Sequence, residues 1–509
     1  MRSATLCHPL LILVAKVRYP CQMCSVWLIG VSFGRLFSVC RISRDHGTHS
    51  DRGIFTLIQI NNDIFPQDLV PQIQKLWDLS AQKIDTIERG WAPGEGAPVF
   101  TVQGKYAARG WTEWTQGFQF GSAILQYDAT GEERFLEFGR SNTIQYMAGH
   151  ITHMGVHDHG FNNVSTYGSL WRLMNEGRIP ENSDQRDFYE LALKCTGAVQ
   201  ARRWTKTPDG GYIYSFNGPH SLFADTIRSL RALALSHKLG QVLMEERDVE
   251  VSLVDRLLQH ARATADYAVY YGEGRDSYDV RGRVAHESIF NINDGHYRCP
   301  NSQQGYSPFT TWTRGLGWIM LGFAEELEFL KSLESTPEIE KATLWMLKAA
   351  QASCDFYIDQ TPADGIPYWD TGAPDLHKLG DYLAKPADPF NDYEPVDSSA
   401  AAIASQGLLR LGHYLRNQGY PEAGKRYWQA GLTVLKTLFA EPYLSTDTNH
   451  QGLILHSIYH RPNGWDYTPP NSQIPNGESS MWGDYHAREA ALYVGRIAEN
   501  GSYYTFFCE

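Results

Sequence analysis

Residues 67–87, QDLVPQIQKLWDLSAQKIDTI, carry an apolar residue about every 3.6 positions. The residues that make this pattern are Leu69, Ile73, Leu76, Trp77 and Leu79. On an α-helix these residues share one face, and an apolar face must pack against another element. The stretch therefore predicts a helix that is covered by neighbouring elements.

The same periodicity recurs along the chain and predicts about twelve helices in all. The other segments are 114–127, 131–148, 165–177, 184–201, 221–239, 247–270, 311–333, 337–358, 397–416, 421–439 and 478–497. The alternation typical of strands is scarce, with short candidates at Gly211–Phe216 and Ile366–Trp369. No repeat with a period of about 20 to 50 residues is evident, which excludes a solenoid of near-identical units.

The order of these segments favours one all-α fold, an (α/α)6 barrel in which six helical hairpins form a toroid. No Pro- or Ser-rich linker interrupts the chain between residues 100 and 500. We assign residues 61–509 to this barrel, and residues 1–60 to an atypical N-terminal segment, either a leader or a disordered extension. Functional residues are expected in the loops at one end of the barrel.

The composition excludes several classes of protein. Of the 509 residues, 42% are hydrophobic and 20% are charged, which is enough for a large core and excludes a mostly disordered chain. The net charge of −12, without a basic run, argues against nucleic acid as a partner. No stretch approaches the roughly 18 apolar residues of a membrane span. The 64 aromatic residues fit either a large core or a carbohydrate site.

The N-terminal segment carries no recognisable functional motif. Cys21 and Cys24 form a C-x-x-C pair, but no second pair follows at metal-ligand spacing, so we assign them no zinc or redox role. A cytoplasmic location is favoured over secretion, which would require a leader in residues 1–60. The sequence leaves the oligomeric state open.

The first candidate site is the loop sequence His157-Asp158-His159-Gly160-Phe161. Two histidines around an aspartate suggest a metal, but a third and a fourth ligand are not evident, so no metal is predicted. Asp158 is either a functional carboxylate or a turn residue, and both interpretations stay open.

The second candidate carboxylate is Asp225, near the start of the predicted helix 221–239. Ser221 has the character of an N-cap, which would place Asp225 in the first turn, where the helix dipole also explains an acidic residue. The preceding run, Gly210–Asn217, brings aromatic residues such as Phe216 to the same end of the helix. This neighbourhood favours a functional role for Asp225.

A third signal is the run from Gln303 to Trp318. Arg314 and Trp318 lie four residues apart, so a guanidinium and an indole would share a helix face. Such a pair suits an anionic sugar, because arginine holds a carboxylate bidentately while the indole covers the ring. The alternative is an arginine packed on a tryptophan between helices. Asp397, at the start of segment 397–416, is interpreted as a helix cap.

Taken in order, these segments resemble the unsaturated glucuronyl hydrolases of glycoside hydrolase family 88. The resemblance covers about residues 65–497 and rests on motifs that include Trp114–Phe118, His157–Phe161, Ala224–Thr226, Gln304–Tyr306, Trp312–Trp318, Asp397–Ala400 and Trp482–Tyr485. It implies an (α/α)6 barrel that uses no cofactor. It also implies an enzyme that releases a 4,5-unsaturated uronic acid from the non-reducing end of lyase-generated oligosaccharides by hydration of C4=C5.

The resemblance also implies roles for single residues. Asp225 would be the general acid/base and Asp158 its paired carboxylate, and we expect burial and Asp158 to raise the pKa of Asp225. The substrate-binding residues would be Trp114, His157, Phe216, His286, Gln304, Arg314 and Trp318. Two alternatives remain: an unsaturated rhamnogalacturonyl-type hydrolase and a non-catalytic carbohydrate-binding toroid. The stretch 462–479 departs from the family pattern, so the neighbouring sugar is left open.

Overall fold

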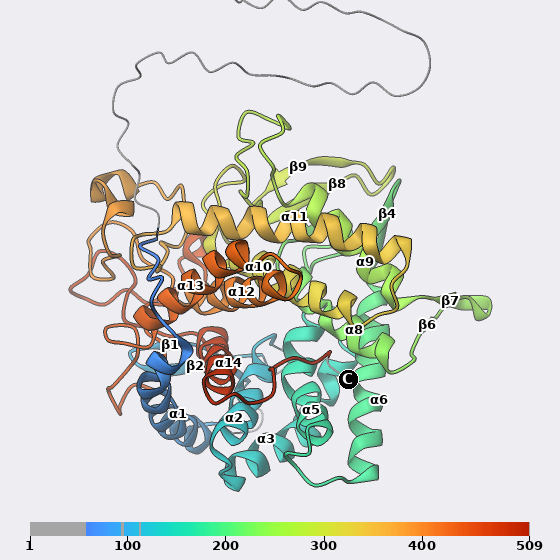
Figure 1. Ribbon diagram of the computed structural model, residues 1–509, viewed down its shortest axis with the longest axis horizontal. Helices are drawn as coiled ribbons and strands as arrows, with labels where there is room; N and C mark the ends of the chain where they lie inside the picture. Colours follow the sequence, from blue (N-terminus) through green and yellow to red (C-terminus); the bar gives the residue numbers. More distant parts are fainter. Residues whose placement is uncertain (1–57, 93–95, 111–112, 508–509) are drawn as a thin grey trace, which may run out of the picture. The chain divides into compact units, whose positions relative to one another are not determined.

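The helices of the computed structural model, which describes residues 58–92, 96–110 and 113–507, alternate along the chain between an outer and an inner ring (Figure 1). The outer helices are α1 (Val70–Gly90), α3 (Glu133–Tyr146), α6 (Ser183–Arg202), α9 (Leu253–Tyr267), α11 (Pro337–Gln360) and α13 (Pro421–Leu438). The inner helices are α2 (Gln116–Thr130), the π-helix η2 (Gly160–Gly168) continued by α5 (Ser169–Asn175), α7 (Thr226–Ser229) with α8 (Arg231–Lys238), α10 (Thr313–Lys331), α12 (Ser398–Asn417) and α14 (Met481–Ala498). A short α4 (Ala148–Ile151) follows α3.

The inner ring is closed. Helix α2 packs on η2, η2 on α7, α7 on α10, α10 on α12, α12 on α14, and α14 returns to α2. Most inner helices also pack against an outer helix that is adjacent in sequence, as α2 does with α3 and α12 with α13. Helix α14 instead packs on the outer helix α1, from the other end of the described chain. The predicted (α/α)6 barrel is thus confirmed.

The inner and outer helices differ in how much of their surface is buried. Nearly every residue of α12 and α14 is buried, polar residues included, because these helices have neighbours on all sides. The outer helix α1 instead buries one face, through residues such as Ile73, Leu76 and Trp77. The apolar period that is visible in residues 67–87 is therefore the signature of an outer helix.

Each predicted helical segment contains an observed helix, but segment 221–239 differs at its start. Ser221–Phe223 forms strand β5, and the helix that follows is broken into α7 and α8. Ser221 is therefore not an N-cap; its hydroxyl donates to Glu287, and Asp225 occupies the N-cap position of α7. The segment Ile366–Trp369 is not a strand and makes only an isolated bridge from Tyr368 to Val396.

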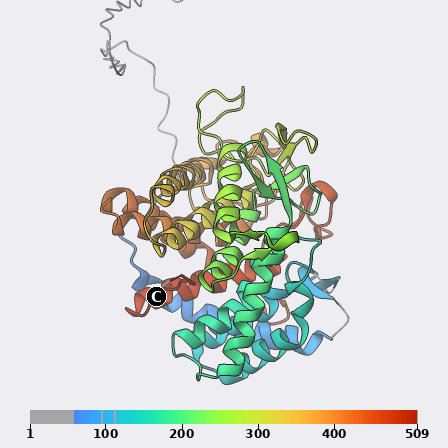
Figure 2. The same cartoon turned by 90° about the vertical axis from the view of Figure 1, so that its right-hand side faces the viewer.

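Short antiparallel sheets form in the loops between the helices. The strands are β1 (Ala97–Val102) with β2 (Lys105–Arg109), β3 (Trp204–Thr207) with β4 (Gly210–Ile213), β5 with β8 (Glu287–Phe290) and β9 (Tyr297–Asn301), and β6 (Leu243–Met244) with β7 (Glu250–Val251). The first three sheets precede inner helices, so they lie at the end of the barrel where the inner helices begin. The β6–β7 hairpin instead follows an inner helix and projects from the barrel (Figures 1 and 2).

Residues 58–60 pack on the barrel, although the sequence placed them in the N-terminal segment. Ile58 is buried, and its N–H donates to the carbonyl of Ile358 at 3.2 Å. The boundary near residue 60 otherwise stays a prediction, because residues 1–57, with Cys21 and Cys24, lie outside the described residues.

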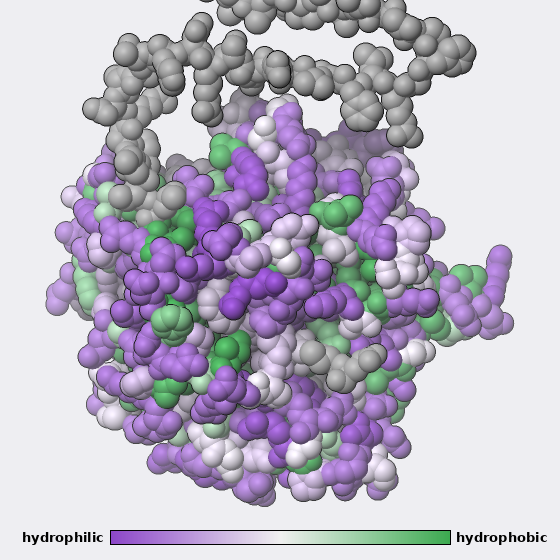
Figure 3. Space-filling model, in the orientation of Figure 1, coloured by the Kyte–Doolittle hydropathy of each residue, from purple (hydrophilic) through white to green (hydrophobic). Residues whose placement is uncertain are grey.

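The described helices include none that is long and apolar enough to cross a membrane. Polar side chains cover most of the face seen in Figure 3.

Candidate active site

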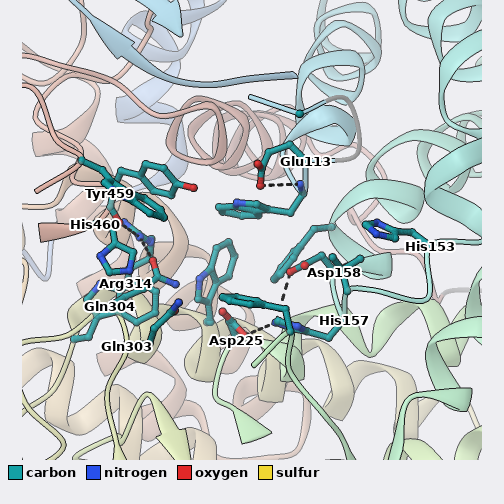
Figure 4. Close-up of a pocket in the computed structure, with 18 residues that line it drawn as sticks. Glu113, His153, His157, Asp158, Asp225, Gln303, Gln304, Arg314, Tyr459 and His460 are labelled. Atoms are coloured by element: carbon teal, nitrogen blue, oxygen red, sulfur yellow. Dashed lines mark hydrogen bonds and ion pairs between the residues drawn. The ribbon is translucent and has the colours of Figure 1, made fainter. Parts of the chain in front are cut away.

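A pocket of about 370 Å³ opens at the end of the barrel where the inner helices begin (Figure 4). Of the residues predicted for the site, those that line it are Trp114, His157, Asp158, Phe216, Asp225, Gln304, Arg314 and Trp318. His286 lies just behind the lining. Residues more than 200 positions apart in the sequence thus meet in one cavity.

The two candidate carboxylates meet at one imidazole. Nε2 of His157 lies 3.2 Å from Oδ1 of Asp225 and 3.6 Å from Oδ1 of Asp158. Each aspartate is 8% exposed and His157 is 1% exposed. The backbone carbonyl of His157 accepts hydrogen bonds from Gln200 Nε2 at 2.9 Å and Ser229 Oγ at 2.7 Å, which fixes the position of the imidazole. His157 and Asp225 can therefore exchange a proton through their hydrogen bond, while Asp158 acts on the imidazole through its charge.

The π-helix η2 begins at Gly160, two residues after Asp158, and sets the direction of the Asp158 backbone. The N–H groups of Phe161 and Asn162 donate to the backbone carbonyl of Asp158 at 3.0 and 3.1 Å, so this carbonyl accepts hydrogen bonds from the start of the helix. His159 turns away from the pocket, and its ring nitrogens contact Thr196 Oγ1 at 2.7 Å and the carbonyl of His153 at 3.0 Å. His157 and His159 consequently do not form a ligand pair.

The two carboxyl groups differ in pKa, and the group with the raised pKa is Asp158 and not, as had been expected, Asp225. Burial raises the pKa of Asp158 above its ordinary value. Burial acts on Asp225 as well, but the hydrogen bond and charge of His157, with the charges of His286 and Arg314, outweigh it and lower the pKa of Asp225. The prediction of a raised pKa for Asp225 is therefore wrong.

The pKa of His157 is raised by the same arrangement. Burial disfavours its protonation, but the charge of Asp158 and the hydrogen bond with Asp225 prevail. A proton in this cluster is therefore held on His157 or Asp158 in preference to Asp225, and the three groups titrate as one coupled unit.

Most of the hydrogen-bond donors of Arg314 are already bonded to other groups of the protein. Its Nη1 donates to Asp397 Oδ2 at 3.2 Å and to the carbonyl of Ile458, and its Nη2 donates to Gln304 Oε1 at 2.8 Å and to the carbonyl of Tyr459 at 2.7 Å. Only its Nε–H is without a partner among the described residues. A bidentate grip on a carboxylate through both terminal nitrogens would displace these partners.

The guanidinium of Arg314 does not lie with Trp318, although the helical spacing puts both on the pocket side. It lies over the rings of Trp312 and Trp482, at 4.5 and 4.8 Å from their centroids. Asp397 also caps α12, since its side chain accepts from the N–H of Ser399 at 3.0 Å. The capping role predicted for Asp397 is thus confirmed, and the ion pair to Arg314 is added to it.

The aromatic residues form the floor and one rim of the pocket. Trp318 is 1% exposed and packs against Phe161, with ring centroids 4.9 Å apart. Trp114 stacks on Trp482 at 4.9 Å and 26°. Phe216 is 51% exposed and lies nearly parallel to His157 at 6.1 Å, so it shields the proton-bearing cluster from one side.

His286 supports the lining instead of forming it. Its Nδ1 accepts the backbone N–H groups of Gln303 and Gln304 at 3.1 and 3.2 Å, which requires the proton on Nε2. Burial lowers the pKa of His286 to about 4. The neutral ring therefore holds the loop that carries Gln303 and Gln304.

Sequence reasoning missed several lining residues: Glu113, His153, Gln303, Trp312, Tyr459, His460 and Trp465. Gln303 and Trp312 stood inside a recognised motif without an assigned role. Tyr459 and His460 come from an irregular loop whose position depends on Asp466, which accepts their backbone N–H groups. The cluster of aromatic and polar residues in that loop was the only available signal.

Known proteins resemble this chain over most of its length. Residues 99–352 match Glycosyl Hydrolase Family 88. The chain is 26% identical over 396 residues to the unsaturated glucuronyl hydrolase of Bacillus sp. strain GL1, covering 77% of this chain and 89% of that one. It is 24% identical over 400 residues to the unsaturated chondroitin disaccharide hydrolase of Streptococcus pyogenes serotype M1, covering 77% and 84%.

Solved structures share the fold. The unsaturated glucuronyl hydrolase of Bacillus sp. GL1 superposes with a TM-score of 0.62 at 22% identity, over 84% of this chain and 97% of that one. An unsaturated glucuronyl hydrolase described as specific for heparin gives a TM-score of 0.63 at 19% identity, over 84% and 98%. The chain therefore belongs to glycosyl hydrolase family 88.

Proposed function

We propose that this protein is an unsaturated glucuronyl hydrolase. It would act on oligosaccharides left by polysaccharide lyases and release the 4,5-unsaturated uronic acid at their non-reducing ends. The observation that carries the proposal is the meeting of Asp158 and Asp225 at His157 inside an aromatic pocket. The names of the relatives, unsaturated glucuronyl hydrolase and unsaturated chondroitin disaccharide hydrolase, support the same substrate class.

The substrate is a vinyl ether, and this fixes the order of the chemical steps. An acid protonates C4 of the C4=C5 bond, which creates an oxocarbenium-like centre at C5, and water then adds at C5. The resulting hemiketal collapses and releases the neighbouring sugar. Ordinary glycosidases instead protonate the glycosidic oxygen and attack the anomeric carbon, so the separation of the two carboxylates would not predict the stereochemistry here.

We assign the protonation of C4 to Asp225. The charge of Arg314, which lines the pocket, lowers the pKa of Asp225, whereas the arginine that lowers the pKa of Asp158 is Arg203, which does not line it. Arg314 therefore defines a cationic side of the pocket whose charge acts on Asp225. The uronate carboxylate, bonded to C5, should lie on that cationic side. C4 would then lie beside Asp225.

The lowered pKa of Asp225 requires a nearby proton source, and His157 supplies one. Its Nε2 is one hydrogen bond, 3.2 Å, from Oδ1 of Asp225. A bound uronate brings a second negative charge towards Asp225 and excludes water, and both changes favour transfer of the proton from His157 to Asp225. Asp158 is the paired carboxylate that stabilises the charge on His157.

Binding of the uronate carboxylate would use groups around Arg314. The Nε–H of Arg314 and the amide nitrogen of Gln304, whose oxygen already accepts from Arg314, are donors on this side of the pocket. Trp114 and Trp318 would contact the sugar ring, while Phe216 would close the side next to His157. No step of this mechanism needs a cofactor.

The test is to follow the near-ultraviolet absorbance of the conjugated C4=C5–carboxylate group during incubation with lyase digests of glycosaminoglycans, ulvan and pectin. We expect loss of absorbance together with release of the neighbouring sugar. Preferential turnover of the pectin digest would favour a rhamnogalacturonyl-type hydrolase. Binding without loss of absorbance would favour a non-catalytic toroid, and equal cleavage of saturated glucuronides would refute the hydration mechanism.

A further inference from the structure

The mouth of the pocket opposite Asp225 is built from two loops. One loop, just before α2, contributes Glu113, and the other, between α13 and α14, contributes Tyr459, His460 and Trp465. In Figure 4, Glu113 and Tyr459 lie across the pocket from Asp225. Because the terminal sugar must reach Asp225, the sugar that follows it lies nearer this mouth.

Glu113 gives the mouth a carboxyl group. Burial raises the pKa of this group above its ordinary value, and the charge of Arg109 acts in the opposite direction. Glu113 is a third carboxyl group in the pocket beside Asp158 and Asp225. Among the described residues that line the pocket, Arg314 is the only one with a permanent positive charge, and it is paired with Asp397 at 3.2 Å. An anionic substituent on the neighbouring sugar would therefore face Glu113 without a lining cation to offset it.

A second cation stands outside the lining. The guanidinium of Arg109 lies 5.4 Å from the ring centroid of Phe100 and 5.5 Å from that of Trp465. This arrangement supports the indole of Trp465, which is 41% exposed at the mouth, by a cation–π contact. Arg109 is exposed to solvent, so its field is screened more strongly than that of the partly buried Glu113.

We propose that Glu113 makes the pocket select an uncharged neighbouring sugar over a sulfated one. This inference rests on the proposed function, since it concerns the sugar that the reaction releases. The carboxylate of Glu113 can accept hydrogen bonds from hydroxyl groups of a neutral sugar, and it repels a sulfate ester at the same place. Trp465 offers that sugar an exposed ring.

The test uses two unsaturated disaccharides that differ only in a sulfate ester on the neighbouring sugar. For wild type we expect a higher kcat/KM with the unsulfated disaccharide. In Glu113→Gln, which keeps the size of the side chain and removes its charge, the ratio of sulfated to unsulfated kcat/KM should rise about fivefold to tenfold, the usual size of one partly screened like-charge contact. Raising the salt concentration should raise the same ratio in wild type but change it little in Glu113→Gln.

Arg109→Ala is the matched variant for the competing interpretation. If Arg109 instead docked the sulfate, Arg109→Ala would lose activity on the sulfated disaccharide selectively, and this result would overturn the proposal. An unchanged ratio in Glu113→Gln, or a wild-type preference for the sulfated substrate, would overturn it too. If Glu113→Gln does not fold, the salt dependence of the wild-type ratio is the test: a ratio that does not rise with salt would overturn the proposal. If wild type consumes neither disaccharide, the proposed function itself fails; turnover with an unaltered ratio refutes only the role of Glu113.

Discussion

Asp225 combines a buried position with a lowered pKa, which is unusual for a proton donor. Its Oδ1 lies 3.2 Å from Nε2 of His157, and the positive side of the pocket keeps it ionised. The advantage of this arrangement lies in timing: the carboxylate receives its proton when a second anion is bound. A donor supplied in this way remains a competent base for the water that attacks next.

Replacing Asp225 by Asn removes both proton transfers without changing the size of the side chain. We expect kcat to fall by about 10²–10⁴-fold, the usual contribution of general acid–base catalysis. The measurement is the loss of ultraviolet absorbance at saturating substrate, with thermal unfolding as a check that the fold persists. A loss of activity below tenfold in a folded variant would remove Asp225 from this role.

Asp158→Asn tests the proton source. The charge of Asp158 is the largest of the influences that raise the pKa of His157, so its removal lowers that pKa. If protonated His157 supplies Asp225, the alkaline limb of the kcat/KM profile should move to lower pH. Glu113→Gln is the control, because it also removes a pocket carboxyl group but leaves both partners of His157 in place. A shift of equal size in the control, or none in Asp158→Asn, would rule out His157 as the source.

Arg314 shows where prediction from spacing ends. Its position four residues before Trp318 correctly put both residues on the pocket side of α10. The direction of the guanidinium is set by Asp397 and by the carbonyls of Ile458 and Tyr459, which are far away in the sequence. No local pattern contains that information.

At the scale of elements, glycines let the inner helices approach closely. A Cβ at Gly407 of α12 would lie 2.8 Å from backbone atoms of Met320 and Leu321 in α10. Equivalent contacts occur between other inner helices, at Gly117, Gly160 and Gly322. The narrow ring that positions the catalytic loops therefore depends on residues without a side chain.

Gly407→Ala should destabilise the fold by about 1–3 kcal/mol, the usual cost of overpacking a core. Gly495→Ala in α14 is the matched control, because its Cβ would meet only Ile73 at 3.7 Å. That substitution should be neutral or stabilising by up to about 1 kcal/mol, since alanine favours a helix more than glycine does. Urea unfolding of both variants measures the difference; equal stabilities would show that the close approach is not required.

The helices could be predicted because each one carries its own period, as α1 and α9 do. Strand β5 could not be predicted, since Ser221–Phe223 is extended only through pairing with Glu287–Phe290, far along the chain. The π-helix η2 was also missed, because its first turns read as a loop motif followed by an ordinary helix. Both errors fall beside Asp158 and Asp225, where the backbone that holds the site residues departs from an ordinary α-helix.

At the scale of the whole molecule, many buried histidines are held neutral. Burial lowers the pKa of His159, His260 and His486 to about 3. It lowers the pKa of His286, His413, His456 and His460 to about 4. Below their ordinary pKa of 6.5, the unfolded chain binds protons that the folded protein does not, so their contribution to stability is present above pH 6.5 and is lost as pH falls towards 4.

Other buried groups act in the opposite sense. Burial raises the pKa of Asp364 and Asp370 to about 6, and the pKa of His157 is raised as well. The folded protein binds these protons first on acidification, which stabilises it. By pH 5.5 the seven histidines hold roughly six protons in the unfolded chain. Burial also raises the pKa of other carboxyl groups, which offset part of this number: Asp158, Glu326, Glu328, Asp466 and Asp484. We expect the contribution of the histidines to be the larger one.

We therefore expect the free energy of unfolding to fall when the pH is lowered from 7.5 to 5.5. Urea unfolding at several pH values measures it, and the slope gives the excess of protons bound by the unfolded chain. His413→Gln removes one of these sites at the edge of the barrel, where the ring stacks on Tyr503 at 4.4 Å, and should reduce the slope. Stability that is constant or rises on acidification would mean that the buried carboxyl groups outweigh the histidines.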